Sequence, residues 1–154
     1  MKKSFMCIDP GLNGTGWAIF QNKKLEDQGV LTFRDNLPWE ERAQMYGASI
    51  RSLHVSYGVN QIFCEYPAFF DSAGGTMVAK KGDLLKLTYV VGLFGGMVYP
   101  TSFHLIPVHV WKGQLPKEVV NKRIKAILGE KKCVNIKTHA WDSVGIGLHV
   151  LGLL

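Results

Sequence analysis

The sequence has little cysteine. Its three cysteines, Cys7, Cys64 and Cys133, are isolated from one another and form no CxxC pair, and an odd number argues against a disulfide framework. Cys7 and Cys64 stand inside apolar, strand-like runs, where a thiol is usually a small buried hydrophobic group. We therefore expect free cysteines and a reducing, cytoplasmic setting.

Long hydrophobic runs are also lacking. The uncharged stretch 87–104 contains three glycines and a proline and falls short of the roughly 20 apolar residues that a membrane helix needs. The opening residues, MKKSFMCID, do not resemble a signal peptide. Repeats, linkers and low-complexity tracts are absent, so we expect one domain over 1–154 and no membrane partner.

Acidic residues become scarce toward the C-terminus. Residues 1–79 hold seven Lys/Arg and eight Asp/Glu, a net charge of −1, whereas residues 80–154 hold eleven and four, a net charge of +7. A basic half suits a polyanionic partner such as nucleic acid. A generic solvated basic surface explains the same charge equally well, so the other motifs have to decide between the two.

The order of the predicted elements indicates the fold class. Apolar runs and turn signals predict strands at 4–9, 14–20, 23–34, 60–67 and 102–108, and helices at 36–58, 83–99, 116–129 and 138–154. Three strands in a meander are followed by strands that alternate with helices. This order predicts an α/β fold, a mixed five-stranded sheet with helices on both faces.

Three acids interrupt apolar segments. Asp9 and Glu65 each lie at the end of a predicted strand, just before a turn, and parallel neighbouring strands would bring them within one or two strand spacings of about 4.8 Å. His139 and Asp142 are three residues apart at the start of the last predicted helix, so they share one face. Hard oxygen ligands with one imidazole suit Mg²⁺ or Mn²⁺, and a pair of such ions can hydrolyse a phosphodiester.

Each acid, taken singly, also has a purely structural explanation. Asp9 can make a local turn hydrogen bond, Glu65 can pair with a lysine, and Asp142 can stabilise a helix N-terminus. The combination is harder to explain in this way, because the three apolar segments must converge and a buried charge needs a partner.

Three motifs in this order resemble the RuvC family of Holliday junction resolvases, within the ribonuclease-H-like superfamily. They are IDPGLNGTGWAIF, CEYP and HAWDSVGIGLHVLG, and the resemblance covers nearly the whole chain. The segment VWKGQLPKEVV, 110–120, is similar to a basic segment of the family, and phage and prophage versions carry similar runs. A phage or prophage origin, in a bacterial cytoplasm or an infected host cell, is therefore expected.

The resemblance implies a role for each acid. Asp9 would bridge two metal ions, Glu65 would hold one, and Asp142 would hold the other with His139 beside it, the ions being Mg²⁺ or Mn²⁺. The common family pattern has an aspartate where His139 stands, which leaves the metal preference open. The glycines after Asp9 would turn the hairpin and leave room for a phosphate backbone.

The resemblance also implies DNA contacts and a homodimer. The family uses the loop after the glutamate strand to probe a four-way junction, for recombination and repair, and cuts it symmetrically as a dimer. In this loop, the residues expected to touch DNA are Phe69, Phe70, Lys80 and Lys81. Outside it, the residues expected to contact phosphates are Lys112, Lys117, Lys122 and Lys125. Trp111, beside Lys112, can equally be a core residue.

Other functions stay open at this point. An RNA-processing nuclease of the same fold would use the same acids. The segment DPGLNGTG also suits the phosphate loop of actin-like and sugar-kinase nucleotide-binding proteins, although these need a second domain. A nucleic-acid-binding module that has lost its metal site is a further alternative, against which the three acids argue.

Overall fold

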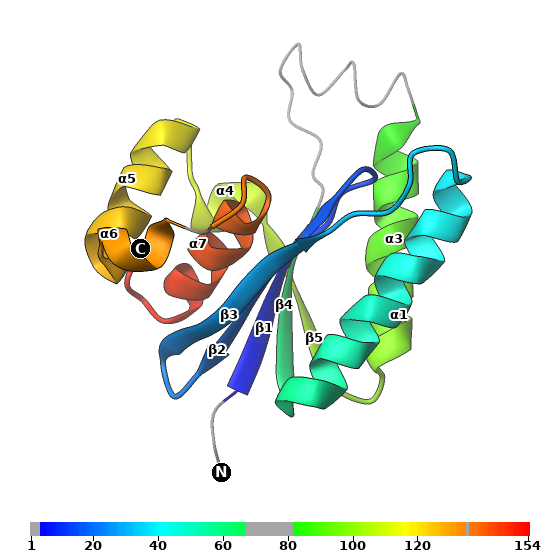
Figure 1. Ribbon diagram of the computed structural model, residues 1–154, viewed down its shortest axis with the longest axis horizontal. Coiled ribbons are helices and arrows are strands. Elements are labelled where there is room, and N and C mark those ends of the chain that lie inside the picture. Colours follow the sequence, from blue (N-terminus) through cyan, green and yellow to red (C-terminus); the bar gives the residue numbers. More distant parts are fainter. Residues whose placement is uncertain (1–3, 67–81, 135) are drawn as a thin grey trace.

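One mixed five-stranded sheet forms the centre of the molecule. The computed structural model describes residues 4–66, 82–134 and 136–154, and its strands lie in the order β3-β2-β1-β4-β5 (Figure 1). Strands β1, β2 and β3 form an antiparallel meander, whereas β4 pairs in parallel with β1 and β5 with β4. The bounds are β1 Ser4–Asp9, β2 Thr15–Gln21, β3 Lys24–Leu31, β4 Gln61–Tyr66 and β5 Ser102–Pro107. The predicted mixed sheet is confirmed.

Helices cover both faces of the sheet, as predicted. Figure 1 shows α1 and α3 on one side and α4 to α7 on the other. The sequence produces this division because successive strand residues point to opposite faces: Met6 and Ile8 join the core under α1 and α3, while Phe5 and Cys7 join the core under α5 and α7. The bounds are α1 Trp39–Tyr57, α3 Asp83–Val98, α4 Val108–Trp111, α5 Lys117–Leu128, α6 Glu130–Cys133 and α7 Ala140–Val150.

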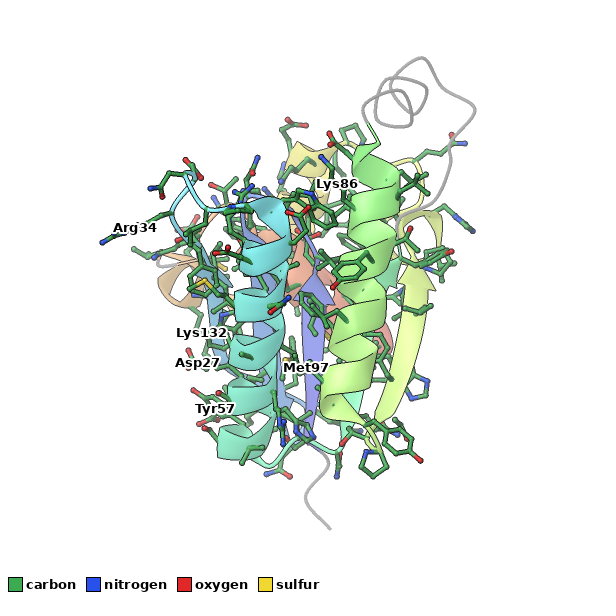
Figure 2. The ribbon with its side chains drawn as sticks, turned by 90° about the vertical axis from the view of Figure 1, so that its right-hand side faces the viewer. Asp27, Arg34, Tyr57, Lys86, Met97 and Lys132 are labelled. Atoms are coloured by element: carbon green, nitrogen blue, oxygen red, sulfur yellow. The ribbon has the colours of Figure 1, made fainter. Side chains whose placement is uncertain are left out.

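Helix α1 is fixed at both ends by features of the sequence. Pro38 precedes its first residue, and Gly58 ends it with a positive φ of 58°. Near its C-terminal end the Tyr57 hydroxyl donates a hydrogen bond to Asp27 of β3, and Gln21 donates to the Tyr57 carbonyl at 3.2 Å. Figure 2 shows α1 beside α3, with Tyr57 and Asp27 toward one end.

The last helix packs directly on the sheet. A Cβ at Gly147 of α7 would come within 2.0 Å of the Phe20 ring on β2, so only glycine allows the observed approach. Helix α7 is shorter than the predicted helix at 138–154, because Gly152 takes a positive φ of 70° and the chain leaves the helix there. The hydrophobic pattern continues to Leu154, and for this reason the predicted helix extends beyond the observed one.

Two short helices were not predicted, and one core assignment was wrong. Helices α4 and α6 have four residues each, too few for a hydrophobic period to be recognised. The helical spacing of apolar residues in 116–129 predicts that Ile127 faces the core, but Ile127 of α5 is 38% exposed. The three cysteines are free, as expected, and Cys133 is buried like Cys7 and Cys64. No helix in the described part of the chain is long and apolar enough to cross a membrane.

Candidate active site

Asp9 and Glu65 lie next to each other at the C-terminal ends of two inner strands of the sheet, β1 and β4. Strands β1 and β4 are parallel neighbours, and Ile8 pairs with Cys64, so the residue after each is an acid. Burial raises the pKa of Asp9 well above its ordinary range, and the charges of Glu65 and Asp142 raise it further. The two carboxylates predicted to converge therefore do so and interact.

Glu65 is held by a tryptophan. The indole Nε1 of Trp111, the last residue of α4, donates a hydrogen bond to Glu65 Oε2 at 3.0 Å. Burial raises the pKa of Glu65 to about 7, and the Asp142 charge adds to this, whereas the Trp111 hydrogen bond and the two lysines Lys112 and Lys117 oppose it. Glu65 is thus a carboxyl that takes up a proton close to neutral pH.

Asp142 joins the two strand acids from α7 and faces two lysines. Lys112 Nζ is 3.9 Å from its Oδ1, and Lys117 Nζ is 3.5 Å from its Oδ2. Its Oδ1 is buried without a hydrogen-bond partner in the described structure. The lysines offset part of the negative charge, since both lower the pKa of Asp9 and of Glu65.

His139 lies beside the glycine-rich turn that follows Asp9. It is the residue before α7, its side chain is exposed, and its ring Cδ2 would be 3.4 Å from a Cβ at Gly14. A Cβ at Gly16 would lie 2.0 Å from the His139 carbonyl oxygen, so this glycine makes room for the start of α7. The glycines after Asp9 were predicted to turn the hairpin and to leave room for a phosphate backbone, whereas their contact with the start of α7 was not predicted.

The donor set fits a divalent cation. In residues 4–66, 82–134 and 136–154 no three His, Cys, Asp or Glu side chains are close enough together, as placed, to form a complete metal cluster. The chemistry nevertheless suits a divalent cation: Asp9, Glu65 and Asp142 offer hard oxygens, the charges of Glu65 and Asp142 repel that of Asp9, and Asp142 Oδ1 makes no hydrogen bond in the described structure. A cation between them would relieve the repulsion that raises the pKa of Asp9.

The other predicted DNA contacts are only partly placed. Lys122 is exposed on α5, and Lys125 lies over the Trp141 ring with its Nζ 5.9 Å from the ring centroid. Phe69, Phe70, Lys80 and Lys81 lie outside the described residues.

Known proteins resemble the chain in sequence and in fold. No family model matches it. The crossover junction endodeoxyribonucleases RuvC of Anaplasma marginale strains Florida and St. Maries are each 27% identical over 147 residues, which cover 92% of this chain and 88% of the relative. The chain is a distant homologue of bacterial RuvC. Its distant relationship to that family was correctly predicted from the motifs.

Solved structures agree on the fold. Thermus thermophilus RuvC in complex with a Holliday junction substrate has a TM-score of 0.72 at 16% identity, over 97% of this chain and 96% of that one. Fowlpox virus resolvase, solved with its substrate Holliday junction DNA, has a TM-score of 0.52 at 14% identity, over 97% and 96%. The ribonuclease-H-like, RuvC-like fold class is confirmed, whereas a phage or prophage origin stays a prediction.

Three side chains of this site make contacts that the sequence did not predict. Trp111 was expected either to contact DNA or to lie in the core. It is a core residue, 4% exposed, and it also donates a hydrogen bond to Glu65. Lys112 and Lys117 were assigned to phosphates, with no expectation that they would face Asp142. The only signal in the sequence was their position in VWKGQLPKEVV, one of the motifs similar to the family.

Proposed function

We propose that the protein is a metal-dependent endonuclease that cleaves branched DNA, with a four-way junction as its substrate. The observation that supports this proposal is the convergence of Asp9, Glu65 and Asp142 at one sheet edge, with two lysines against them. The sequence relatives are crossover junction endodeoxyribonucleases, and two structures of the same fold hold Holliday junction DNA. A phage or prophage origin and a cytoplasmic location remain part of the proposal.

The three carboxylates are the proposed metal ligands, with His139 beside them. Two Mg²⁺ or Mn²⁺ ions, when bound, would activate a water molecule and stabilise the leaving oxygen of a phosphodiester. Asp9 and Glu65 must lose their protons to act as ligands, because only the ionised carboxylate binds a metal well. Their raised pKa values mean that ligation becomes easier as the pH rises.

The lysines are proposed to serve the substrate. Lys112 and Lys117 offset the Asp142 charge in the structure, and a phosphate backbone entering the site would offer their ammonium groups a second anionic partner. Lys122, Lys80 and Lys81 are proposed to add phosphate contacts, which fits a net charge of +7 over residues 80–154.

A homodimer is proposed because a four-way junction needs two symmetric cuts. The outer face of α3 supports this. Its exposed side chains include Leu85 at 77%, Tyr89 at 47% and, just beyond the helix, Tyr99 at 84%, and the helix carries no charge after Lys86. Gly92 and Gly96 have nothing within 4 Å of an added Cβ. An exposed apolar face of this kind suits a second copy of the same helix, since two uncharged faces meet without unpaired charges.

The test is a cleavage assay on matched four-way, Y-shaped and linear DNA and on RNA duplexes. Asp9→Asn should lower cleavage of the four-way junction by more than about 1,000-fold in Mg²⁺ or Mn²⁺, since several kcal/mol of charge stabilisation is lost. Junction binding should persist, and Asp35→Asn, at an exposed carboxylate, should cleave normally. Appreciable activity of Asp9→Asn would overturn the assignment, and preference for RNA would favour an RNA-processing nuclease.

A further inference from the structure

Trp111 touches two of the elements that carry the proposed metal ligands. Its Nε1 is 3.0 Å from Glu65 Oε2 at the end of β4. The indole N–H is a donor only, so the direction of this bond is fixed and the carboxylate accepts. The tryptophan is 4% exposed, so its indole N–H has little access to water and Glu65 is its hydrogen-bond partner.

The opposite edge of the indole packs on α7. A Cβ at Gly145 would lie 2.6 Å from Trp111 Cζ3, which means that the ring already occupies that space. Gly145 is three residues after Asp142 and therefore lies on nearly the same face of the helix, one turn further on. The indole thus lies between the Glu65 carboxylate and the helix that bears Asp142.

The next residue along the chain reaches the second acid. Lys112 follows Trp111 directly, and its Nζ is 3.9 Å from Asp142 Oδ1. The last residue of the short helix α4 therefore contacts Glu65, and the residue directly after the helix reaches Asp142. Few conformations of so short a segment satisfy both contacts and the packing on Gly145 at once.

We infer that Trp111 is a positioning residue of the proposed metal site, which fixes the Glu65 carboxylate relative to Asp142 and presents Glu65 Oε1 to the cation. The inference rests on the proposed function, and it adds a residue that holds a ligand without touching the ion. Groups that orient metal ligands by hydrogen bonding typically change metal affinity by about 10- to 100-fold when removed.

A role in packing alone makes a different prediction. If Trp111 only fills space, a phenylalanine would lower stability and leave metal binding unchanged in the folded protein. Trp17 provides the matched control, since it is buried to a similar degree, at 9% exposed, and packs in the core on the other face of the sheet.

The experiment measures Mn²⁺ binding to the full chain without DNA, by the signal of free Mn²⁺ in electron paramagnetic resonance. Trp111→Phe should weaken Mn²⁺ binding by about 10- to 100-fold, while Trp17→Phe binds Mn²⁺ normally. The Mn²⁺ concentration for half-maximal junction cleavage should rise in parallel for Trp111→Phe, and the KM for the junction should stay unchanged. Equal Mn²⁺ affinity of Trp111→Phe and the wild type would overturn the inference.

A second pair of variants separates the hydrogen bond from the ring. Replacing Trp111 with 3-benzothienylalanine keeps the ring shape and removes the N–H, so the variant should fold and still bind Mn²⁺ more weakly. In a Glu65→Gln background Trp111→Phe should cause no further loss, and a full additional loss there would contradict action through Glu65. If Glu65→Gln itself binds Mn²⁺ normally, the proposed metal site fails; if only the tryptophan variants bind normally, the positioning role alone fails.

Discussion

Glu65 should make the metal-free protein less stable as the pH rises. Its pKa is raised from 4.5 to about 7, mainly by burial, so the folded state holds a proton that the unfolded chain has already released between these values. The contribution of Glu65 to stability is therefore greatest below about pH 4.5, falls as the pH rises toward 7, and is level above it. Glu65→Gln removes this dependence, because the amide stays neutral at every pH.

The size of the effect follows from the two pKa values. The difference between 4.5 and about 7 corresponds to about 3 kcal/mol, at about 1.4 kcal/mol for each pH unit. The glutamine carbonyl can still accept the hydrogen bond from Trp111, so the packing around position 65 is kept. We expect Glu65→Gln to be more stable than the wild type by about 3 kcal/mol at pH 8 and equally stable at pH 4.

The assay is urea unfolding in EDTA at several pH values, from which the free energy of unfolding is extrapolated. Glu26→Gln, at an exposed position on β3, is the control and should follow the wild type. Saturating Mn²⁺ should stabilise the wild type and do little for Glu65→Gln. A Glu65→Gln protein that is less stable than the wild type at pH 8 in EDTA would refute the reasoning, because the ionised Glu65 would then be stabilised by its lysine neighbours.

The remaining predictions concern metal choice, DNA contacts and assembly. His139→Asp should raise Mg²⁺-supported cleavage relative to Mn²⁺, and identical metal profiles would place His139 away from the ions. Changing Phe69 and Phe70 to alanine should reduce junction cleavage more than binding to linear duplex, whereas equal losses would exclude stacking. Lys117→Gln should weaken junction binding and lower its salt slope by about 1, and an unchanged slope would exclude a phosphate contact. Tyr89→Glu should produce monomers by light scattering, and a dimer that survives would exclude the α3 face.

The positions of the strand acids could be predicted because they depend on short-range patterns. An apolar run that ends at Asp9 or Glu65 puts the carboxylate at the end of a strand, and the alternation of strands and helices after 36 predicts parallel pairing. Parallel pairing then brings both acids to the same end of the two strands, and this can be predicted without knowing any side-chain contact. The same logic placed Asp142 on an apolar helix that had to pack on the sheet.

The partners of these acids could not be predicted in this way. Trp111 and Glu65 are 46 residues apart, and their hydrogen bond depends on the four-residue helix α4, which no periodicity reveals. Lys112 and Lys117 look like any exposed basic residues in the sequence, and only the position of α7 brings Asp142 within 4 Å of both. Contacts of this kind depend on how elements meet, whereas sequence patterns report what each element is.

The energetics of the site argue against a binding module that has lost its chemistry. Asp9, Glu65 and Asp142 are brought together where burial and mutual repulsion raise the pKa of the first two, and the ion pairs of Lys112 and Lys117 are made with Asp142. Replacing buried charges by apolar groups of similar size is often neutral or stabilising, so folding alone gives no reason for all three carboxylates. The proposed divalent cation would supply that reason, because it would favour the ionised form of each acid. Clusters of buried like charges, which are unfavourable for folding, are expected at functional sites. Here the three acids lie in the three motifs that resemble the resolvases.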